Sequence, residues 1–163
     1  MKSFYKLVLA AYVLTLLWVV LFKFSYDFSA ILASYQTRSL NLIPFVYSAG
    51  SNRSEVVSNF IAFVPFGLLL SVTFKRAGLL QKLVAISLFS LAAEIVQYVL
   101  AIGVTDITDV IMNTLGGLAG LLVYSAGIKI VSEKNFDRFV AVTCAILLIA
   151  CILIRVLLLR VQY

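Results

Sequence analysis

The chain has 163 residues, of which 63% are hydrophobic and only 12% are charged, and its mean hydropathy is +1.11. This composition predicts an integral membrane protein rather than a soluble domain. The formal net charge of +6 does not predict nucleic-acid binding, because Lys and Arg in membrane proteins report topology and contact with lipid headgroups. The chain contains no histidine, which excludes a histidine general base, a Ser/His/Asp triad and a His-ligated metal.

Five apolar stretches have the length that a helix needs to cross the hydrocarbon core. They are residues 5–24, 56–74, 79–102, 107–130 and 139–159. We therefore expect one all-α, polytopic helix bundle over residues 1–163, with about five transmembrane helices. Only residues 103–106 separate the third stretch from the fourth, and their Gly, Thr and Asp predict a tight helical hairpin.

One long connection, residues 25–55, separates the first two stretches. Its Phe28, Ile31, Leu32 and Tyr35 recur at helical spacing, as in a short amphipathic helix lying on the membrane surface. An ordinary loop with scattered apolar residues explains the pattern equally well.

The basic residues predict the orientation of the bundle. If the spans alternate, most of the 13 Lys and Arg residues fall on the same side as Lys2 and Lys6. The side richer in Lys and Arg is normally cytoplasmic. We therefore expect a cytoplasmic N-terminus, with residues 25–55 outside.

Glu94 is the most unusual residue of the third span. An ionisable group in the middle of a membrane helix costs about 2.5 to 3.5 kcal/mol, so such groups usually face a cavity or a partner. Gln97 lies three residues further along nearly the same face. Since burial disfavours a bare carboxylate, Glu94 is expected to be protonated, hydrogen-bonded or matched by a cation.

The fourth span begins with a polar stripe. Asp106, Asp109 and Asn113 follow i, i+3, i+7 spacing and share one face. Small residues that continue the stripe allow another helix to approach closely, and we expect that helix to be the third span. These small residues are Gly116, Gly117 and Gly120.

The second span adds a polar residue and a predicted kink. Asn59 lies near its outer end, and Pro65 with Gly67 should bend the helix and free a carbonyl. All of these polar residues then map to the outer leaflet. Each also has a structural explanation: Asp106 can cap the fourth span, and the amides of Asn59, Gln97 and Asn113 can hydrogen-bond between helices.

The sequence resembles the VanZ-like family of bacterial membrane proteins, named for a teicoplanin-resistance protein. Four segments in family order carry the resemblance over residues 40–125: residues 41–45 (Asn-Leu-Ile-Pro-Phe), Asn59 with residues 65–67 (Pro-Phe-Gly), Glu94 with Gln97, and Asp106 or Asp109 with Asn113 and Gly116. Gly103 stands where the family often has an arginine. The resemblance implies a bacterial plasma-membrane protein of the cell envelope, linked in the founding member to lowered susceptibility to a lipoglycopeptide antibiotic.

We expect a binding protein whose outward-facing acidic and amide pocket takes a lipid-linked cell-wall component or the antibiotic. The candidate ligand-binding residues are Asn41, Asn59, Glu94, Gln97, Asp106, Asp109 and Asn113. One alternative is an intramembrane enzyme with Glu94 and Asp109 as an acid/base pair. A small proton-linked transporter and a scaffold are two others. No cofactor is expected, although Glu94 and Asp109 could hold a divalent cation.

Overall fold

Five long helices make up most of the chain. The computed structural model describes residues 1–22, 39–45, 53–102 and 104–161. Within these ranges, five helices are long and apolar enough to cross a membrane, as the sequence predicts. They are α1 (Lys2–Phe22), α3 (Arg53–Thr73), α4 (Leu79–Leu100), α5 (Ile107–Ile130) and α6 (Glu133–Val161). The chain is thus an all-α, multi-pass membrane protein, while the expected amphipathic segment with Phe28, Ile31, Leu32 and Tyr35 lies outside the described residues.

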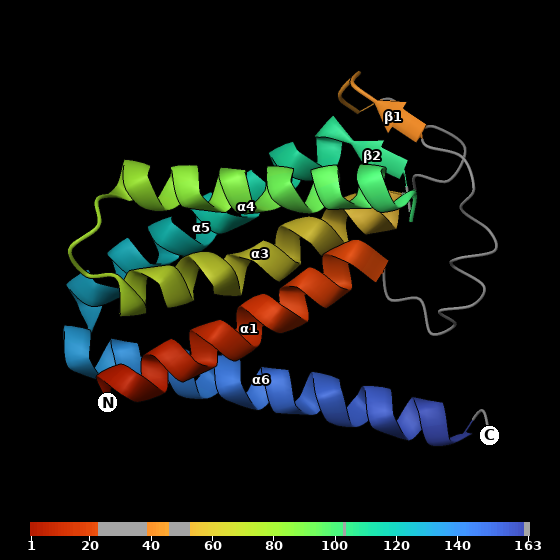
Figure 1. Ribbon diagram of the computed structural model, residues 1–163. Helices are drawn as coiled ribbons and strands as arrows, with labels where there is room; N and C mark the ends of the chain where they lie inside the picture. The colour runs from red at the N-terminus through yellow and green to blue at the C-terminus, as the bar shows by residue number, and fades with distance from the viewer. Residues whose placement is uncertain (23–38, 46–52, 103, 162–163) are drawn as a thin grey trace.

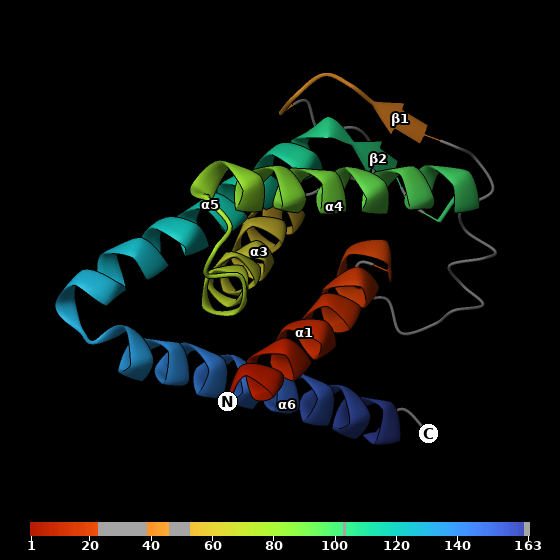
Figure 2. The same cartoon turned by 60° about the vertical axis from the view of Figure 1, so that its left-hand side comes forward.

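The helices run between two distinct ends of the bundle. The start of α1, the α3–α4 turn and the α5–α6 turn gather at one end, which we call the basic end because it holds Lys2, Lys6, Lys75 and Arg76 (Figure 1). Two short strands lie at the opposite end, which we call the strand end (Figures 1 and 2).

Helix α3 is the central helix of the bundle. In its most apolar window 44% of the residues are buried, against 28% in the windows of α1, α4 and α6. Its fully buried Phe63 and Leu69 join Ile86 of α4 and Leu121 of α5 in the core. The outer faces carry exposed apolar side chains, as expected for helices surrounded by lipid.

Glycines bring α3 and α5 into backbone contact. A Cβ atom on Gly116 would lie 2.1 Å from the carbonyl oxygen of Phe60, and one on Gly120 would lie 2.1 Å from that of Val64. The prediction that this stripe faces the third span, α4, is therefore wrong for both residues. Gly117 does approach α4, where its Cβ would meet the Ile86 side chain.

Pro65 lies inside α3, which continues through it to Thr73. Proline has no N–H for the carbonyl of Ile61, four residues earlier. In the same turn, the hydroxyl of Tyr12 on α1 donates a hydrogen bond to the carbonyl oxygen of Ala62, at 2.7 Å. Helix α1 is thus fastened to α3 at the turn that the proline weakens.

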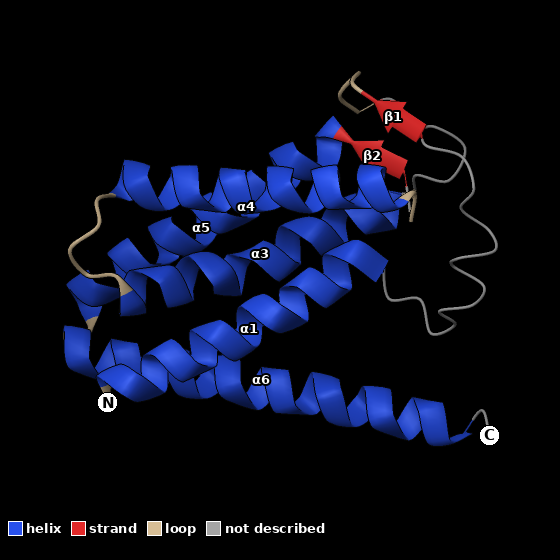
Figure 3. Ribbon diagram, viewed as in Figure 1, coloured by secondary structure: helices blue, strands red, loops and turns tan. Residues whose placement is uncertain are grey.

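The two strands form a small parallel pair that the sequence did not predict. Strand β1 (Ser39–Asn41) lies between α1 and α3 in the chain, and β2 (Val104–Asp106) lies between α4 and α5 (Figure 3). Asn41 stands opposite Asp106 in the register. Helices α4 and α5 do form the predicted hairpin, in which the Asn113 amide donates to the Ser90 hydroxyl, but its connection is not a single tight turn: α4 ends at Leu100, its C-cap Ala101 is left-handed, and residues 104–106 are extended.

Replacing Gly116 by alanine should loosen the α3–α5 contact. The added methyl cannot fit against the Phe60 carbonyl, so the helices must separate, at an expected cost of about 1–3 kcal/mol in the free energy of unfolding. Denaturant unfolding of the purified protein in detergent measures this loss. The control is Gly78→Ala, whose Cβ would meet only Gln81 Oε1, at 3.9 Å. Equal stability of the two variants would contradict the proposed packing.

Candidate functional site

Asp106 joins three elements at the strand end. It is the N-cap of α5, where its Oδ1 accepts a hydrogen bond from the Thr108 backbone N–H at 2.8 Å. Its Oδ2 accepts one from the side-chain amide of Asn41 on β1, at 3.1 Å. Its own backbone N–H donates to Oε2 of Glu94 on α4, at 3.1 Å. One residue therefore links β1, α4 and α5, and its expected capping role is confirmed.

Residues 41–45 fold back onto the start of α5. The backbone N–H of Ile43 donates to Oδ1 of Asn41 at 3.1 Å, which forms a local side-chain turn. The N–H of Phe45 donates to Oγ1 of Thr108 at 3.0 Å. Phe45 has a φ of 61°, which is uncommon for a residue other than glycine. This segment is therefore fixed to the helix end by side-chain hydrogen bonds rather than by apolar packing alone.

Glu94 is buried, with an exposed fraction of 2%. Besides its carboxylate bond to the Asp106 N–H, its backbone carbonyl accepts a hydrogen bond from the Thr105 hydroxyl at 3.3 Å. Both bonds hold β2 against α4. Hydrogen bonding is one of the three ways in which the sequence analysis expects a buried acid to be tolerated, and the structure supplies it.

A cavity of about 200 Å³ adjoins this junction, and we call it the strand-end groove. Most of its wall is apolar, whereas the sequence predicts a pocket lined by acids and amides. Glu94 and Asp106 belong to the wall, but both are almost fully buried behind its apolar side chains. The lining residues are Leu40, Leu42, Leu91, Glu94, Ile95, Tyr98, Thr105, Asp106, Ile107 and Val110.

The other candidate residues do not reach this groove. The Gln97 amide donates to the carbonyl oxygen of Val20 on α1, at 2.8 Å, and the Asn113 amide donates to the Ser90 hydroxyl on α4, also at 2.8 Å. Both amides therefore hydrogen-bond between helices, as the structural explanation expects. Asn59 is half-buried on α3, and Asp109 is buried in the first turn of α5; neither lines the groove.

The expected Glu94–Asp109 pairing does not form the groove. The acid beside Glu94 in the wall is Asp106 instead. In the part of the chain that the structure describes, no three His, Cys, Asp or Glu side chains are grouped so that they could hold a metal ion. The arrangement is thus suited to holding the strand pair in place and to receiving an apolar group.

Sequence reasoning missed the apolar and hydroxyl residues that build the groove. Leu40 and Leu42 line the groove because β1 pairs with β2, and Thr108, outside the groove, fixes residues 41–45 by accepting a hydrogen bond from the Phe45 N–H. The Asn-Leu-Ile-Pro-Phe segment was a usable signal, because a polar residue followed by apolar ones and proline can leave a loop and pack on a helix.

Comparison with known proteins identifies the family of this fold and site. The family model described as VanZ/LLP1 matches residues 9–131. The chain belongs to the VanZ/LLP1 family. The match extends from α1 to the end of α5 and so includes the strand pair and the groove, beyond the residues 40–125 of the expected resemblance. A relative named Protein VanZ, from Enterococcus faecium, is 46% identical over 155 residues, which are 95% of this chain and 94% of the relative. No solved structure matches.

The substitution Thr108→Val should release residues 41–45 from α5. Valine keeps the shape of threonine but removes the acceptor of the Phe45 N–H, so the stability of the local contact falls by about 1 kcal/mol. Hydrogen exchange should become faster at the Phe45 amide. Thr114→Val is the matched control, because the Thr114 hydroxyl bonds to Ser87 on α4 instead. Unchanged exchange at Phe45 in Thr108→Val would disprove this anchoring.

Proposed function

We propose that the protein lowers bacterial susceptibility to teicoplanin-class antibiotics by binding an amphiphile with an apolar tail in the strand-end groove. The ligand is either a lipid-linked cell-wall component or the lipoglycopeptide itself, and both carry such a tail. Membership of the VanZ/LLP1 family supports the link to the cell envelope. The mostly apolar groove beside two buried acids is the observation that carries the proposal.

In this proposal the protein lies in the bacterial plasma membrane with its N-terminus in the cytoplasm. The basic end then faces the cytoplasm and the strand end faces outward. The greater number of Lys and Arg residues at the basic end supports this orientation. Both candidate ligands would meet the strand end from the outer leaflet.

The groove favours an apolar group over a sugar or a peptide. Its wall combines Leu40 and Leu42 of the β1 segment with Leu91 and Ile95 of α4. Leu91 is 43% exposed and Ile95 is 54% exposed, so the groove borders the lipid-facing surface of α4. A lipid tail can enter from that surface and lie against the apolar wall that covers Glu94 and Asp106.

Binding is better supported than catalysis. In the enzyme hypothesis Glu94 and Asp109 act as a pair, but Asp109 does not line the groove. The Glu94 carboxylate also holds the Asp106 N–H. If Glu94 were a general base, gaining and losing a proton during turnover would disturb its hydrogen bond to the Asp106 N–H, which fixes β2.

Filling the groove should abolish protection. In Leu91→Trp the larger side chain occupies the space expected for the tail, so the minimum inhibitory concentration of teicoplanin should fall to that of cells without the protein. Leu88→Trp is the matched control, because Leu88 is 60% exposed one turn earlier on α4 and does not line the groove. Immunoblots of membranes check that both variants accumulate equally. Full protection by Leu91→Trp would refute the groove as the binding site.

Removing the acid of Glu94 should also weaken protection, because its buried carboxylate lies in the groove wall and its charge acts on a ligand bound there. Glutamine keeps the volume and an oxygen that can accept from the Asp106 N–H, but it cannot carry a negative charge. The expected result for Glu94→Gln is a lower inhibitory concentration at an unchanged level of protein in the membrane. The same change at Glu55, which does not line the groove, should have no effect. Protection equal to that of the unaltered chain would remove Glu94 from the site.

A further inference from the structure

A second and larger cavity lies at the basic end, far from the strand-end groove. Its volume is about 690 Å³, and we call it the basic-end cavity. The start of α1, the end of α3, the α3–α4 turn and the start of α6 all contribute to its wall. Four of its lining residues are cationic, namely Lys2, Lys6, Lys75 and Arg76, and one is acidic, Asp137.

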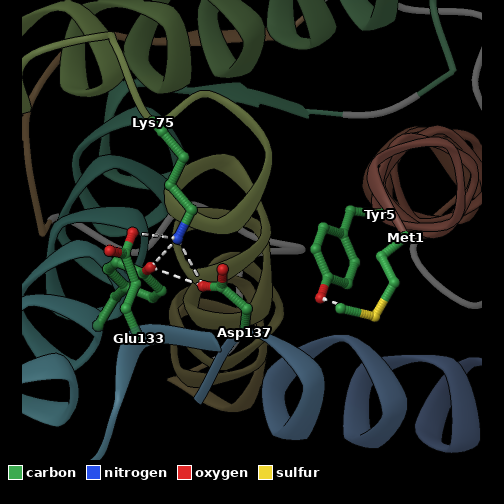
Figure 4. A network of polar contacts seen from close by, with 6 residues as sticks. Met1, Tyr5, Lys75, Glu133 and Asp137 are labelled. Carbon is green, nitrogen blue, oxygen red and sulfur yellow. Dashed lines mark hydrogen bonds and ion pairs between the residues drawn. The ribbon is translucent and has the colours of Figure 1, made fainter. Parts of the chain in front are cut away.

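Lys75 is held by acids of α6. Its Nζ lies 2.6 Å from Oδ1 of Asp137 and 2.8 Å from Oε1 of Glu133 (Figure 4). It also donates a hydrogen bond to the hydroxyl of Tyr124, which in turn donates to Asp137 Oδ1 at 2.6 Å. Burial lowers the pKa of Lys75, but the bonds to Asp137, Glu133 and Tyr124 outweigh this effect and raise the pKa above its ordinary value. Lys75 therefore stays charged at neutral pH and is paired with Asp137, the one acid among the lining residues.

The other three cations give the cavity an excess of positive charge. Lys2, Lys6 and Arg76 form no ion pair with an acid in the described part of the chain. Lys2 and Lys6 are four residues apart on α1 and so share one helix face. Three cations from two separate segments thus line the same cavity with no acid beside them to neutralise their charge.

Hydrogen bonds fix the α3–α4 turn, which forms part of the cavity wall. Oε1 of Gln81 accepts from the Gly78 N–H at 2.9 Å, and the Ala77 N–H donates to the Phe74 carbonyl oxygen at 3.2 Å. These bonds hold the turn that carries Arg76. The Oγ1 of Thr73, another lining residue, is buried and has no hydrogen-bond partner among the described residues. The cavity wall therefore contains a hydrogen-bonded turn that carries Arg76, together with a buried hydroxyl that has no partner among the described residues.

We propose that the basic-end cavity is a binding site for a phosphate group. Charge-assisted bonds from Lys and Arg are the common way in which proteins hold phosphate. Apolar residues also line the cavity, among them Phe74, which is 49% exposed. This mixture suits the headgroup of an anionic phospholipid, whose acyl chains begin beside its phosphate, and basic pockets between transmembrane helices bind such headgroups. A soluble phosphate ester has the same charge without the chains.

Ligand titrations of the purified full-length protein test this proposal. The bound species are counted by native mass spectrometry, and the thermal midpoint is followed with phosphatidylglycerol, phosphatidylcholine or glycerol phosphate. We expect phosphatidylglycerol to bind more tightly than phosphatidylcholine. In the double variant Lys6→Gln/Arg76→Gln its dissociation constant should rise by roughly 30-fold, because two cations are lost. Stabilisation by phosphatidylglycerol alone assigns the site to lipid, and equal stabilisation by glycerol phosphate assigns it to soluble phosphate.

The matched control is Lys129→Gln/Lys134→Gln, which removes two exposed charges at the same end without altering the cavity wall. It should keep the affinity of the unaltered chain for phosphatidylglycerol. Equal weakening in both double variants, or equal affinity for the two phospholipids, would overturn the proposal. If Lys6→Gln/Arg76→Gln does not fold, Lys2→Gln/Lys6→Gln replaces it, because this second variant leaves both Arg76 and the α3–α4 turn unaltered.

Discussion

Polar groups that are buried away from water gain stability only from hydrogen-bond partners inside the protein. Asp106 meets this constraint by capping α5, binding the Asn41 amide and donating to Glu94. These bonds place an irregular segment against the helices at the end of the bundle. This segment forms one side of the groove, so the shape of the groove depends on a few polar contacts as well as on the apolar packing that holds the bundle.

The helices were predictable because each one depends on the hydropathy and length of a single continuous stretch of sequence. Predicted and observed bounds of α5 agree, and those of α4 differ only near its end at Leu100. The contact partners of Gly116 and the pairing of Asn41 with Asp106 were not predictable in the same way, because they join residues far apart in the sequence. Spacing shows that Gly116 and Gly120 share a face, but it cannot show which helix that face meets.

The candidate site was predicted in part for the same reason. Glu94 and Asp106 do lie together, because burial of an acid demands a partner and the chain turn supplies one. Gln97 and Asn113 bond elsewhere, since an amide on a helix can serve any neighbouring helix. The network of Lys75 and Asp137 at the basic end was missed, because its members lie near helix ends where charge is ordinary.

The account depends most on an apolar-tailed ligand occupying the strand-end groove. Photo-crosslinking tests this directly, with a diazirine analogue of leucine, which keeps the size of the leucine side chain, at position 91 or 88 of the protein in nanodiscs. Teicoplanin or a lipid-linked cell-wall precursor is then added, and the adducts are mapped by mass spectrometry. The account predicts an adduct at position 91 that saturates as the ligand concentration is raised, with little at position 88. Equal adducts at both positions, or none at position 91 with either ligand, would contradict it.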